Sequence, residues 1–370
     1  MKSLRIVADD KIPFLRGRAE QLGSVKYLPG ASISASDVRD ADVLVVRTRT
    51  RCNKALLAGS QVKFVATATI GYDHIDTAYL AEAGIGWANC PGCNAASVAQ
   101  YVENSLICLE EERNFPLRGK TVGIVGLGHV GSEVFKAVSR LGCRIVCSDP
   151  PVEETLDFLR RNTSAEKKIS RPEKKISAAE IFPFSAEIFL PLEQLAREAD
   201  IVTFHTPLTY TGKCPTYHLA NASFFDNLKP GAVLLNTSRG EVVETSALLR
   251  ALDSGRVGEA VIDTWEDEPC INTDLLRRAF IATPHIAGYS ADGKANGTRM
   301  ALEAVAAFAG RHEMSFDIRL TEASQAGNAA YPPESPLFLY DPRLDSQRLK
   351  NSPRDFEKLR GDYPFRRERK

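Results

Sequence analysis

The stretch that decides the fold reads TVGIVGLGHVGSEVFKAVSRLGCRIVCSD and covers residues 121–149. An apolar run rich in β-branched residues predicts a strand at 122–125, a helix-like segment follows, and a second apolar run occupies 143–147. The turn between strand and helix has GxGxxG spacing, with glycines at Gly126, Gly128 and Gly131. In such a unit the first glycine permits the tight turn, the second lets the backbone approach a pyrophosphate, and the third lets the helix pack on the strand. The helix N-terminus offers free N–H groups and a partial positive charge to the phosphates, so the stretch predicts a dinucleotide-binding unit.

An acidic residue at the end of the second apolar run indicates which dinucleotide binds. Asp149 lies 18 residues after Gly131, close to the spacing at which a carboxylate accepts a hydrogen bond from the ribose 2′-hydroxyl. A carboxylate there repels a 2′-phosphate, and NAD is therefore favoured over NADP. The structural alternative is that Asp149 is a turn residue before Pro150 and Pro151.

The bulk composition is that of an ordinary globular protein. The 370 residues are 44% hydrophobic and 25% charged, and 47 basic residues balance 47 acidic ones. A chain of this length is expected to form two or three domains. Zero net charge argues against bulk attraction to nucleic acid or to a membrane. The N-terminal MKSLRIVADD runs into charge too early for a signal peptide, and no apolar stretch approaches the roughly 18 residues of a membrane helix, so we expect a cytoplasmic protein.

The eight cysteines do not indicate a metal site or a disulfide framework. Several lie inside apolar runs, where cysteine behaves as a small hydrophobic residue. Cys90 and Cys93 have C-x-x-C spacing, but no second pair and no histidine cluster accompany them, so no zinc site is expected. We interpret all eight as reduced thiols of a reducing compartment.

Short strand and helix patterns alternate along most of the chain. Before residue 95, strands are expected at 4–8, 43–46 and 63–67, and helices at 13–22 and 54–58. A long helix at 94–113 precedes the dinucleotide unit, and later patterns predict strands at 201–204, 232–236 and 260–263 and helices at 248–252 and 295–310. Such alternation predicts parallel sheets covered by helices on both faces, the α/β class.

Two segments depart from this alternation. Residues 151–190 contain repeats seven residues apart, EKKIS at 166–170 and 173–177 and AEIF at 179–182 and 186–189. Two copies are too few for a solenoid, so we interpret the segment as a surface insertion, with a short amphipathic helix pair as the alternative. From Tyr331 onward proline and charge are dense, but bulky side chains there argue against plain disorder.

Three chemically suited side chains each follow a predicted strand, where ligands bind in open α/β sheets. They are Arg239, Glu268 and His285. A guanidinium can grip a carboxylate and polarise the reacting oxygen, and a histidine can take a hydroxyl proton as hydride leaves for nicotinamide. A carboxylate beside that histidine fixes its tautomer and stabilises the imidazolium. Taken singly, each is as readily a surface charge or a loop residue, and only their joint occurrence behind a nucleotide unit indicates catalysis.

The order of these motifs resembles the D-isomer-specific 2-hydroxyacid dehydrogenases. Beside GxGxxG and Asp149, the shared motifs are Phe-His-Thr-Pro at 204–207, Asn-x-x-Arg-Gly at 236–240, Asp-x-Trp-Glu-x-Glu-Pro at 263–269 and Thr-Pro-His-Ile at 283–286. Glu268 lies 29 residues after Arg239, and His285 lies 17 residues after Glu268, which agrees with the family. The resemblance implies that these three residues form the catalytic set. Glu266 is the competing glutamate, and the proline after Glu268 decides against it.

The resemblance also implies a fold and a division into domains. A Rossmann-type, doubly wound parallel sheet would form the NAD-binding domain at 96–285, with an insertion at about 151–190. A flavodoxin-like α/β substrate domain would combine 1–95 with 286–325. Residues 326–370 would form a small C-terminal dimerisation region, because the tail FEKLRGDYPFRRE at 356–368 resembles such a region.

The cofactor implied by the resemblance is NAD. Besides Asp149 and the three glycines, the implied NAD-binding residues lie at the glycine-rich turn and at the ends of later strands: His129, Val130, Thr206, Thr237, Ser238, Asp263 and Gly288. At a strand end near the nicotinamide, Asp263 would be placed to accept a hydrogen bond from the carboxamide. The structural alternative for Asp263 is a turn or helix cap.

Further matches single out family members that act on a phosphorylated substrate, among them VVRTRT at 45–50 and HIAGYSADGKANGT at 285–298. Such a substrate has a carboxylate and a phosphate, together roughly three negative charges at neutral pH. Substrate contacts are implied at Thr48, Thr69 and Tyr289.

Two arginines after a predicted strand, Arg47 and Arg49, are candidates for binding the phosphate. Because side chains alternate in direction along a strand, only one of the two arginines would point to the phosphate, and we favour Arg47. In the alternative interpretation both are solvated charges.

The resemblance therefore implies NAD-dependent oxidation of a small phosphorylated 2-hydroxy acid at its C2 hydroxyl by a homodimer, and the neutral composition predicts that neither nucleic acid nor membrane is bound. One alternative is an enzyme for another 2-hydroxy acid, of the phosphoglycerate or the glyoxylate and hydroxypyruvate type. The other is an NAD-sensing scaffold that binds protein partners. The intact set of Arg239, Glu268 and His285 favours an enzyme.

Overall fold

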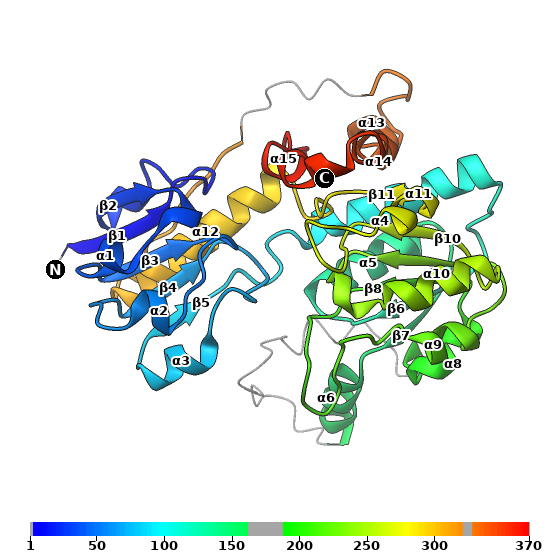
Figure 1. Cartoon of the computed structure of the whole chain (residues 1–370), viewed down its shortest axis with the longest axis horizontal. Coiled ribbons are helices and arrows are strands. Elements are labelled where there is room, and N and C mark those ends of the chain that lie inside the picture. Colours follow the sequence, from blue (N-terminus) through cyan, green and yellow to red (C-terminus); the bar gives the residue numbers. More distant parts are fainter. Residues whose placement is uncertain (1–2, 162–187, 321–327, 370) are drawn as a thin grey trace. The chain divides into compact units, whose positions relative to one another are not determined.

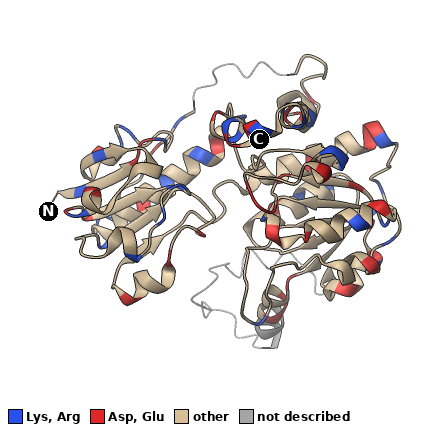
Figure 2. Cartoon of the chain, viewed as in Figure 1, with Lys and Arg blue, Asp and Glu red and all other residues tan. Residues whose placement is uncertain are grey.

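The computed structural model describes residues 3–161, 188–320 and 328–369. The chain divides into two compact units, Met1–Asn94 with Ser290–Ser324 and Ala95–Tyr289 with Gln325–Lys370 (Figure 1). Most of the predicted insertion, including its repeats, lies outside the described residues. Figure 2 shows acidic and basic residues interspersed along both units, as expected for a chain without net charge.

The first unit is built on a five-stranded parallel sheet with the order β2-β1-β3-β4-β5, which is the flavodoxin-like order. Its strands are β1 Leu4–Asp9, β2 Gly23–Leu28, β3 Val43–Val46, β4 Phe64–Thr67 and β5 Gly86–Ala88. Its α-helices are α1 Ala35–Val38, α2 Lys54–Leu57, α3 Thr77–Glu82 and α12 Ala291–Phe308. Every residue of β3 is buried, because helices cover both faces of a parallel sheet. The expected flavodoxin-like α/β fold is confirmed.

One local prediction in this unit is wrong. The helix expected at 13–22 is a series of turns with a single 3-10 turn, η1, at Ala19–Gln21. Phe14 and Gly17 have left-handed φ values of 62° and 81°, which interrupt a right-handed helix. The edge strand β2 and the short β5 were not predicted, because no residue of β2 is fully buried and β5 is three residues long.

The second unit contains a six-stranded parallel sheet with the order β11-β10-β9-β8-β6-β7. Its strands are β6 Thr121–Val125, β7 Arg144–Ser148, β8 Ile201–Phe204, β9 Ala232–Asn236, β10 Val257–Ile262 and β11 Ile281–Ala282. The strand order reverses at β6, which lies between β7 and β8. Open α/β sheets bind ligands outside the carboxyl ends of the strands at such a switch point, and the glycine-rich turn follows β6 directly. The predicted Rossmann-type sheet is confirmed.

Alternate strand residues of this sheet face two apolar cores. In β9, Leu234 belongs to one core and Leu235 to the other. The first core is closed by α8 Leu192–Glu198, α9 Ala222–Asn227, α10 Thr245–Asp253 and α11 Thr273–Arg278. The second is closed by α4 Ala95–Arg113, α5 His129–Arg140 and the N-terminal end of α6 Pro150–Arg161. Helices therefore lie on both faces, as Figure 1 shows.

The C-terminal residues pack on this sheet unit. They form α13 Pro336–Leu339, α14 Pro342–Asn351, η5 Pro353–Asp355 and α15 Phe356–Gly361. Leu337 and Tyr340 enter the core beside α4, whereas Leu349 and Phe356 enter the core on the other face. These residues thus contribute to the cores of the nucleotide unit itself. Among the described residues, no helix is both long and apolar enough to cross a membrane, and no group of three His, Cys, Asp or Glu side chains is placed to hold a metal ion.

Candidate active site

The glycine-rich turn after β6 has the geometry that its spacing predicts. Gly126 has φ +91°, and a Cβ there would lie 2.9 Å from the carbonyl of His205. A Cβ on Gly131 would lie 2.0 Å from the carbonyl oxygen of Gly126. A Cβ on Gly128, the N-cap of α5, would meet no protein atom within 4 Å. Packing thus requires the outer two glycines, while the middle one faces open space at the helix N-terminus, which suits a pyrophosphate.

Asp149 closes this turn from the end of β7. Its buried carboxylate accepts a hydrogen bond from the backbone N–H of Leu127 at 2.8 Å and another from the N–H of Val152, in the first turn of α6, at 3.1 Å. Asp149 therefore organises the turn and caps α6. Its predicted contact with the ribose 2′-hydroxyl stays a prediction, as do the cofactor contacts of His129 and Val130, which begin α5.

The charge of Asp149 is testable apart from its hydrogen bonds. Asp149→Asn keeps an acceptor for Leu127 but removes the charge, and Asp149→Ala removes both. If the carboxylate excludes NADP, both variants should raise the ratio of kcat/KM for NADP to that for NAD. Steady-state kinetics with each cofactor measures this ratio. Equal losses with both cofactors in the alanine variant, with an unaltered ratio in the asparagine variant, would leave Asp149 as a turn residue only.

The ends of β8 and β9 lie beside the turn. The His205 imidazole lies between two hydroxyls, with Nε2 2.9 Å from Thr203 Oγ1 and Nδ1 3.2 Å from Thr237 Oγ1. Burial lowers the pKa of His205 to about 3, so its ring is neutral. The hydroxyl of Thr206 is buried and has no hydrogen-bond partner among the described residues. A buried polar atom of this kind is expected to have a partner, and a bound cofactor would provide one.

Arg239 follows β9 in a turn built by Asn236. The Asn236 side chain donates to the carbonyl oxygen of Arg239 at 2.9 Å and accepts from the backbone N–H and the hydroxyl of Ser238. A Cβ on Gly240 would lie 1.9 Å from the backbone carbonyl of Trp265. Only glycine therefore allows the Arg239 turn to approach the loop that follows β10, which contains Glu268.

His285 and Glu268 form a close pair. The His285 Nδ1 lies 2.8 Å from Oε2 and 3.1 Å from Oε1 of Glu268, and the backbone N–H of Trp265 donates to Oε1 at 3.0 Å. Burial opposes ionisation of Glu268, but His285, Arg360 and the Trp265 N–H together outweigh burial and lower the pKa of the carboxyl. His285 has a left-handed φ of 57°, which is uncommon outside glycine and is often found at functional positions.

Asp263 holds the loop that carries His285. The buried carboxylate accepts hydrogen bonds from the Thr283 hydroxyl at 2.6 Å and from the N–H groups of Ile286 and Ala287 at 2.7 and 2.9 Å. The carbonyl oxygen of Asp263 also accepts from the N–H of His285 at 2.8 Å. Burial raises the pKa of Asp263, although His285 and these donors act in the opposite direction. Asp263 thus holds the loop residues from His285 to Ala287.

The two candidate glutamates have different partners. Glu266 lies 2.6 Å from His218 Nε2 and accepts from the N–H of Thr245, the first residue of α10, at 2.7 Å. Glu268, which precedes the proline, is the one that pairs with His285. Glu266 thus serves the packing of its own loop.

The predicted substrate residues of the first unit follow its central strands. Arg47 donates from Nε and Nη2 to the carboxylate of Asp9 at 3.1 and 3.3 Å, and Asp9 is fully buried at the end of β1. Thr48 is exposed directly after β3. The hydroxyl of Thr69, after β4, lies 2.7 Å from that of Thr67. Because β1, β3 and β4 are neighbouring parallel strands, these residues lie together at the carboxyl ends of the central strands.

Two relevant residues were not found from the sequence. Asp9 is the last residue of β1, and Arg47 is the first residue after β3. This shared position at a strand end could have identified Asp9 from the sequence. Arg360 of α15 contacts both Glu268 and Tyr289, at 3.4 Å from Nη1 to Oε2 and 3.3 Å from Nε to the phenol oxygen. No motif links these positions, which lie 92 and 71 residues apart.

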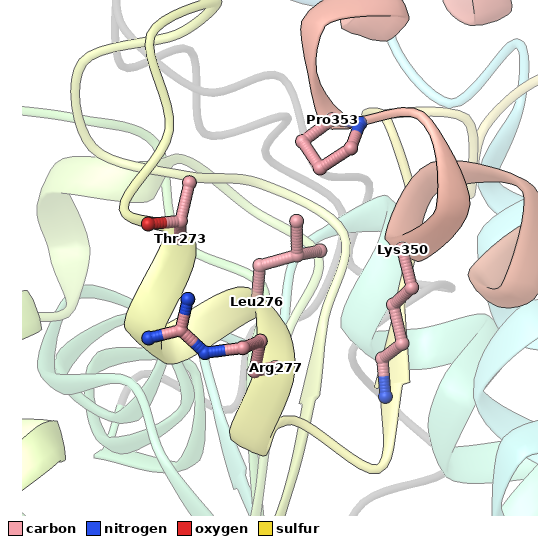
Figure 3. A pocket seen from close by; sticks show the side chains of 5 residues that line it. All are labelled: Thr273, Leu276, Arg277, Lys350 and Pro353. Atoms are coloured by element: carbon pink, nitrogen blue, oxygen red, sulfur yellow. The ribbon is translucent and has the colours of Figure 1, made fainter.

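A surface pocket elsewhere on the second unit contains none of the predicted site residues. Figure 3 shows its lining: Thr273, Leu276, Arg277, Lys350 and Pro353. The Lys350 ammonium donates to the carbonyl oxygens of Ala279 and Phe280, which joins α14 to the segment before β11. The pocket is thus a packing seam beside α14.

Comparison with known proteins shows similarity over nearly the whole chain. Residues 96–287 match the family model described as D-isomer specific 2-hydroxyacid dehydrogenase, NAD binding domain. The chain is 49% identical to an erythronate-4-phosphate dehydrogenase of Bacteroides fragilis over 99% of its own length and 97% of the relative. It is 47% identical to the protein of that name from Bacteroides thetaiotaomicron, with 99% and 98% covered. The NAD⁺-bound 3-phosphoglycerate dehydrogenase of Entamoeba histolytica is similar in fold, with a TM-score of 0.65 at 22% identity over 86% of this chain and 100% of that one.

Proposed function

We propose that this chain, which belongs to the family of D-isomer-specific 2-hydroxyacid dehydrogenases, oxidises 4-phospho-D-erythronate at C2 with NAD. The product would be (R)-3-hydroxy-2-oxo-4-phosphooxybutanoate, an intermediate on the route to pyridoxal 5′-phosphate, vitamin B6. The observation that carries the proposal is the Glu268–His285 pair beside the Arg239 turn, in a unit with a complete dinucleotide turn. We further propose that the protein is cytoplasmic. We also propose that it is a homodimer, and light scattering on the purified chain would test this oligomeric state.

The residues divide the chemistry between them. Bound NAD would supply the acceptor for the hydride of C2. Since Glu268 accepts from Nδ1 of His285, Nε2 is left to take the proton of the C2 hydroxyl. The Glu268 carboxylate then stabilises the imidazolium. Arg239 grips the substrate carboxylate and orients it.

The phosphate requires cationic and hydroxyl donors. Arg47, Thr48 and Thr69, which follow neighbouring strands of the first unit, are the proposed donors. The hydrogen bonds to Asp9 fix the orientation of the Arg47 guanidinium. A fixed guanidinium favours a directed contact with the phosphate over a freely solvated charge. Arg49, exposed two residues later, is the second candidate.

Arg47→Ala tests this assignment. A lost charge-assisted phosphate contact costs about 1.5–3 kcal/mol, so kcat/KM for 4-phospho-D-erythronate should fall roughly 10- to 150-fold. Turnover of the unphosphorylated analogue glycerate should change little. Because the buried Asp9 carboxylate loses its ion-pair partner, the melting temperature should also fall, and activity should be assayed well below it. Arg49→Ala is the matched control, and equal losses on both substrates in Arg47→Ala would move the phosphate site away from Arg47.

The proposed function itself is tested by NADH fluorescence against a panel of 2-hydroxy acids. Turnover with 4-phospho-D-erythronate well above turnover with phosphoglycerate, glycerate or glycolate is expected. Preference for another acid would overturn the substrate but retain the reaction class. Binding of NADH without turnover of any acid would favour the scaffold function.

A further inference from the structure

Arg360 is a cation of the C-terminal segment that lies at the Glu268–His285 pair. Its side chain is only 18% exposed, and its guanidinium reaches two groups of the site at once. One nitrogen contacts Glu268 Oε2, the same oxygen that lies 2.8 Å from His285 Nδ1, and another donates to the hydroxyl of Tyr289. The guanidinium therefore joins a proposed catalytic carboxylate to a proposed substrate-binding phenol.

The segment around Arg360 is fixed on both sides. Phe356, which begins α15, is 1% exposed in the core beside α10 and α11. Beyond the helix, Arg366 is buried and its guanidinium donates to carbonyl oxygens of the loop after His285 and of α4, those of Ile286, Ala287, Tyr289 and Ser97. The Arg366 guanidinium also lies over the Tyr340 ring at 4.0 Å from its centroid. These contacts hold the C-terminal segment against the loop that carries His285, so the position of Arg360 is set by packing.

We propose that Arg360 is a positioning residue of the reaction, whose guanidinium holds Glu268 as a charged partner for His285 and aligns the Tyr289 hydroxyl. This inference rests on the proposed dehydrogenase function and extends the site into the C-terminal residues. It assigns those residues a role within their own subunit that does not depend on dimer formation.

The charges around Glu268 determine which measurement would detect the positioning role of Arg360. Among the described residues, His285 and Arg360 are charged or titratable groups that act on Glu268, and Tyr289 and Asp263 act on Arg360. When His285 is neutral, Arg360 is the cation that the described part of the chain places within ion-pair distance of the Glu268 carboxylate. Removal of the cation makes proton uptake by the Glu268–His285 pair easier, because one positive charge no longer opposes it. Oxidation needs the unprotonated pair, so its acidic limb should move to higher pH.

The test is the pH profile of kcat/KM for oxidation in Arg360→Gln. The acidic limb should move up by about one pH unit, in keeping with the effect of a charge at this distance. Turnover should be about tenfold below the wild type at pH values below the limb and should recover as the pH rises. Arg360→Lys, which keeps the charge, should lie closer to the wild type. Arg360→Met, with an unbranched apolar stem, is a second variant without the charge should the glutamine protein not fold.

Controls separate this role from folding and from failure of the proposed function. Arg354→Gln removes an exposed guanidinium from the neighbouring η5 and should leave the profile unchanged. The affinity for NADH, from fluorescence titration, should be unaltered in Arg360→Gln. A loss that is the same at every pH, or a limb at the wild-type position, overturns the positioning role. If the wild type itself oxidises no 2-hydroxy acid, the proposed function fails first, and the variant profiles are not reached.

Discussion

Replacement of His285 by asparagine is expected to lower kcat for oxidation by roughly 10²–10⁴-fold, the usual consequence of losing a general base. Asparagine is similar in size and can still donate to Glu268, but it has no ring nitrogen to take the hydroxyl proton. Asparagine also tolerates the left-handed φ of 57° at this position, so the backbone should not be strained. NADH affinity should stay within a few-fold of the wild type, because the glycine-rich turn is unaltered.

Stopped-flow or steady-state NADH fluorescence measures both quantities. His312→Asn is the matched control, since His312 is exposed in the segment after α12 and should have no effect. Near-normal kcat in His285→Asn would remove His285 from the chemistry. A large loss of NADH affinity together with kcat would instead indicate that the loop had rearranged.

Much of the fold follows from local patterns. The strands at 43–46, 201–204 and 232–236 have the predicted bounds, because buried parallel strands are short apolar runs between polar turns. The false helix at 13–22 has an apolar spacing typical of helices, but Phe14 adopts a left-handed conformation that a propensity argument does not anticipate. Phe356 belongs to the core that α8 to α11 close, and no local pattern around Phe356 encodes this long-range packing.

The site was predictable to the extent that strand ends define it. Arg239 was predicted because it follows a strand, which the structure shows as β9, and Glu268 was preferred because a proline distinguishes it from Glu266. The partners of these residues were harder to find, since the pairing of Arg47 with Asp9 and of Glu268 with Arg360 requires the three-dimensional arrangement. Of the predicted residues, Asp263 is the one whose role depends most on this three-dimensional arrangement.

Asp263→Asn is expected to lower kcat by about 10²-fold through displacement of the His285 loop, since misplacement by about 1 Å has effects of this order. The carboxylate accepts three hydrogen bonds, from Thr283, Ile286 and Ala287. An amide has one acceptor oxygen, and its NH₂ group would face at least one buried N–H. Each donor left unpaired costs about 1–3 kcal/mol, so the melting temperature should fall as well.

The two roles considered for Asp263 differ in whether the asparagine substitution changes kcat or the affinity for NADH. If Asp263 acts chiefly on the nicotinamide carboxamide, the asparagine variant should weaken NADH binding, while a substrate-saturated enzyme keeps most of its kcat. If it acts chiefly on the loop, kcat should fall with NADH affinity within a few-fold of the wild type, as measured by fluorescence titration. Asp267→Asn makes the same chemical change at an exposed position of the neighbouring loop and should alter neither constant. Because every oxygen of the Asp263 carboxylate already has a protein donor, we expect the second result, and an intact kcat in Asp263→Asn would contradict it.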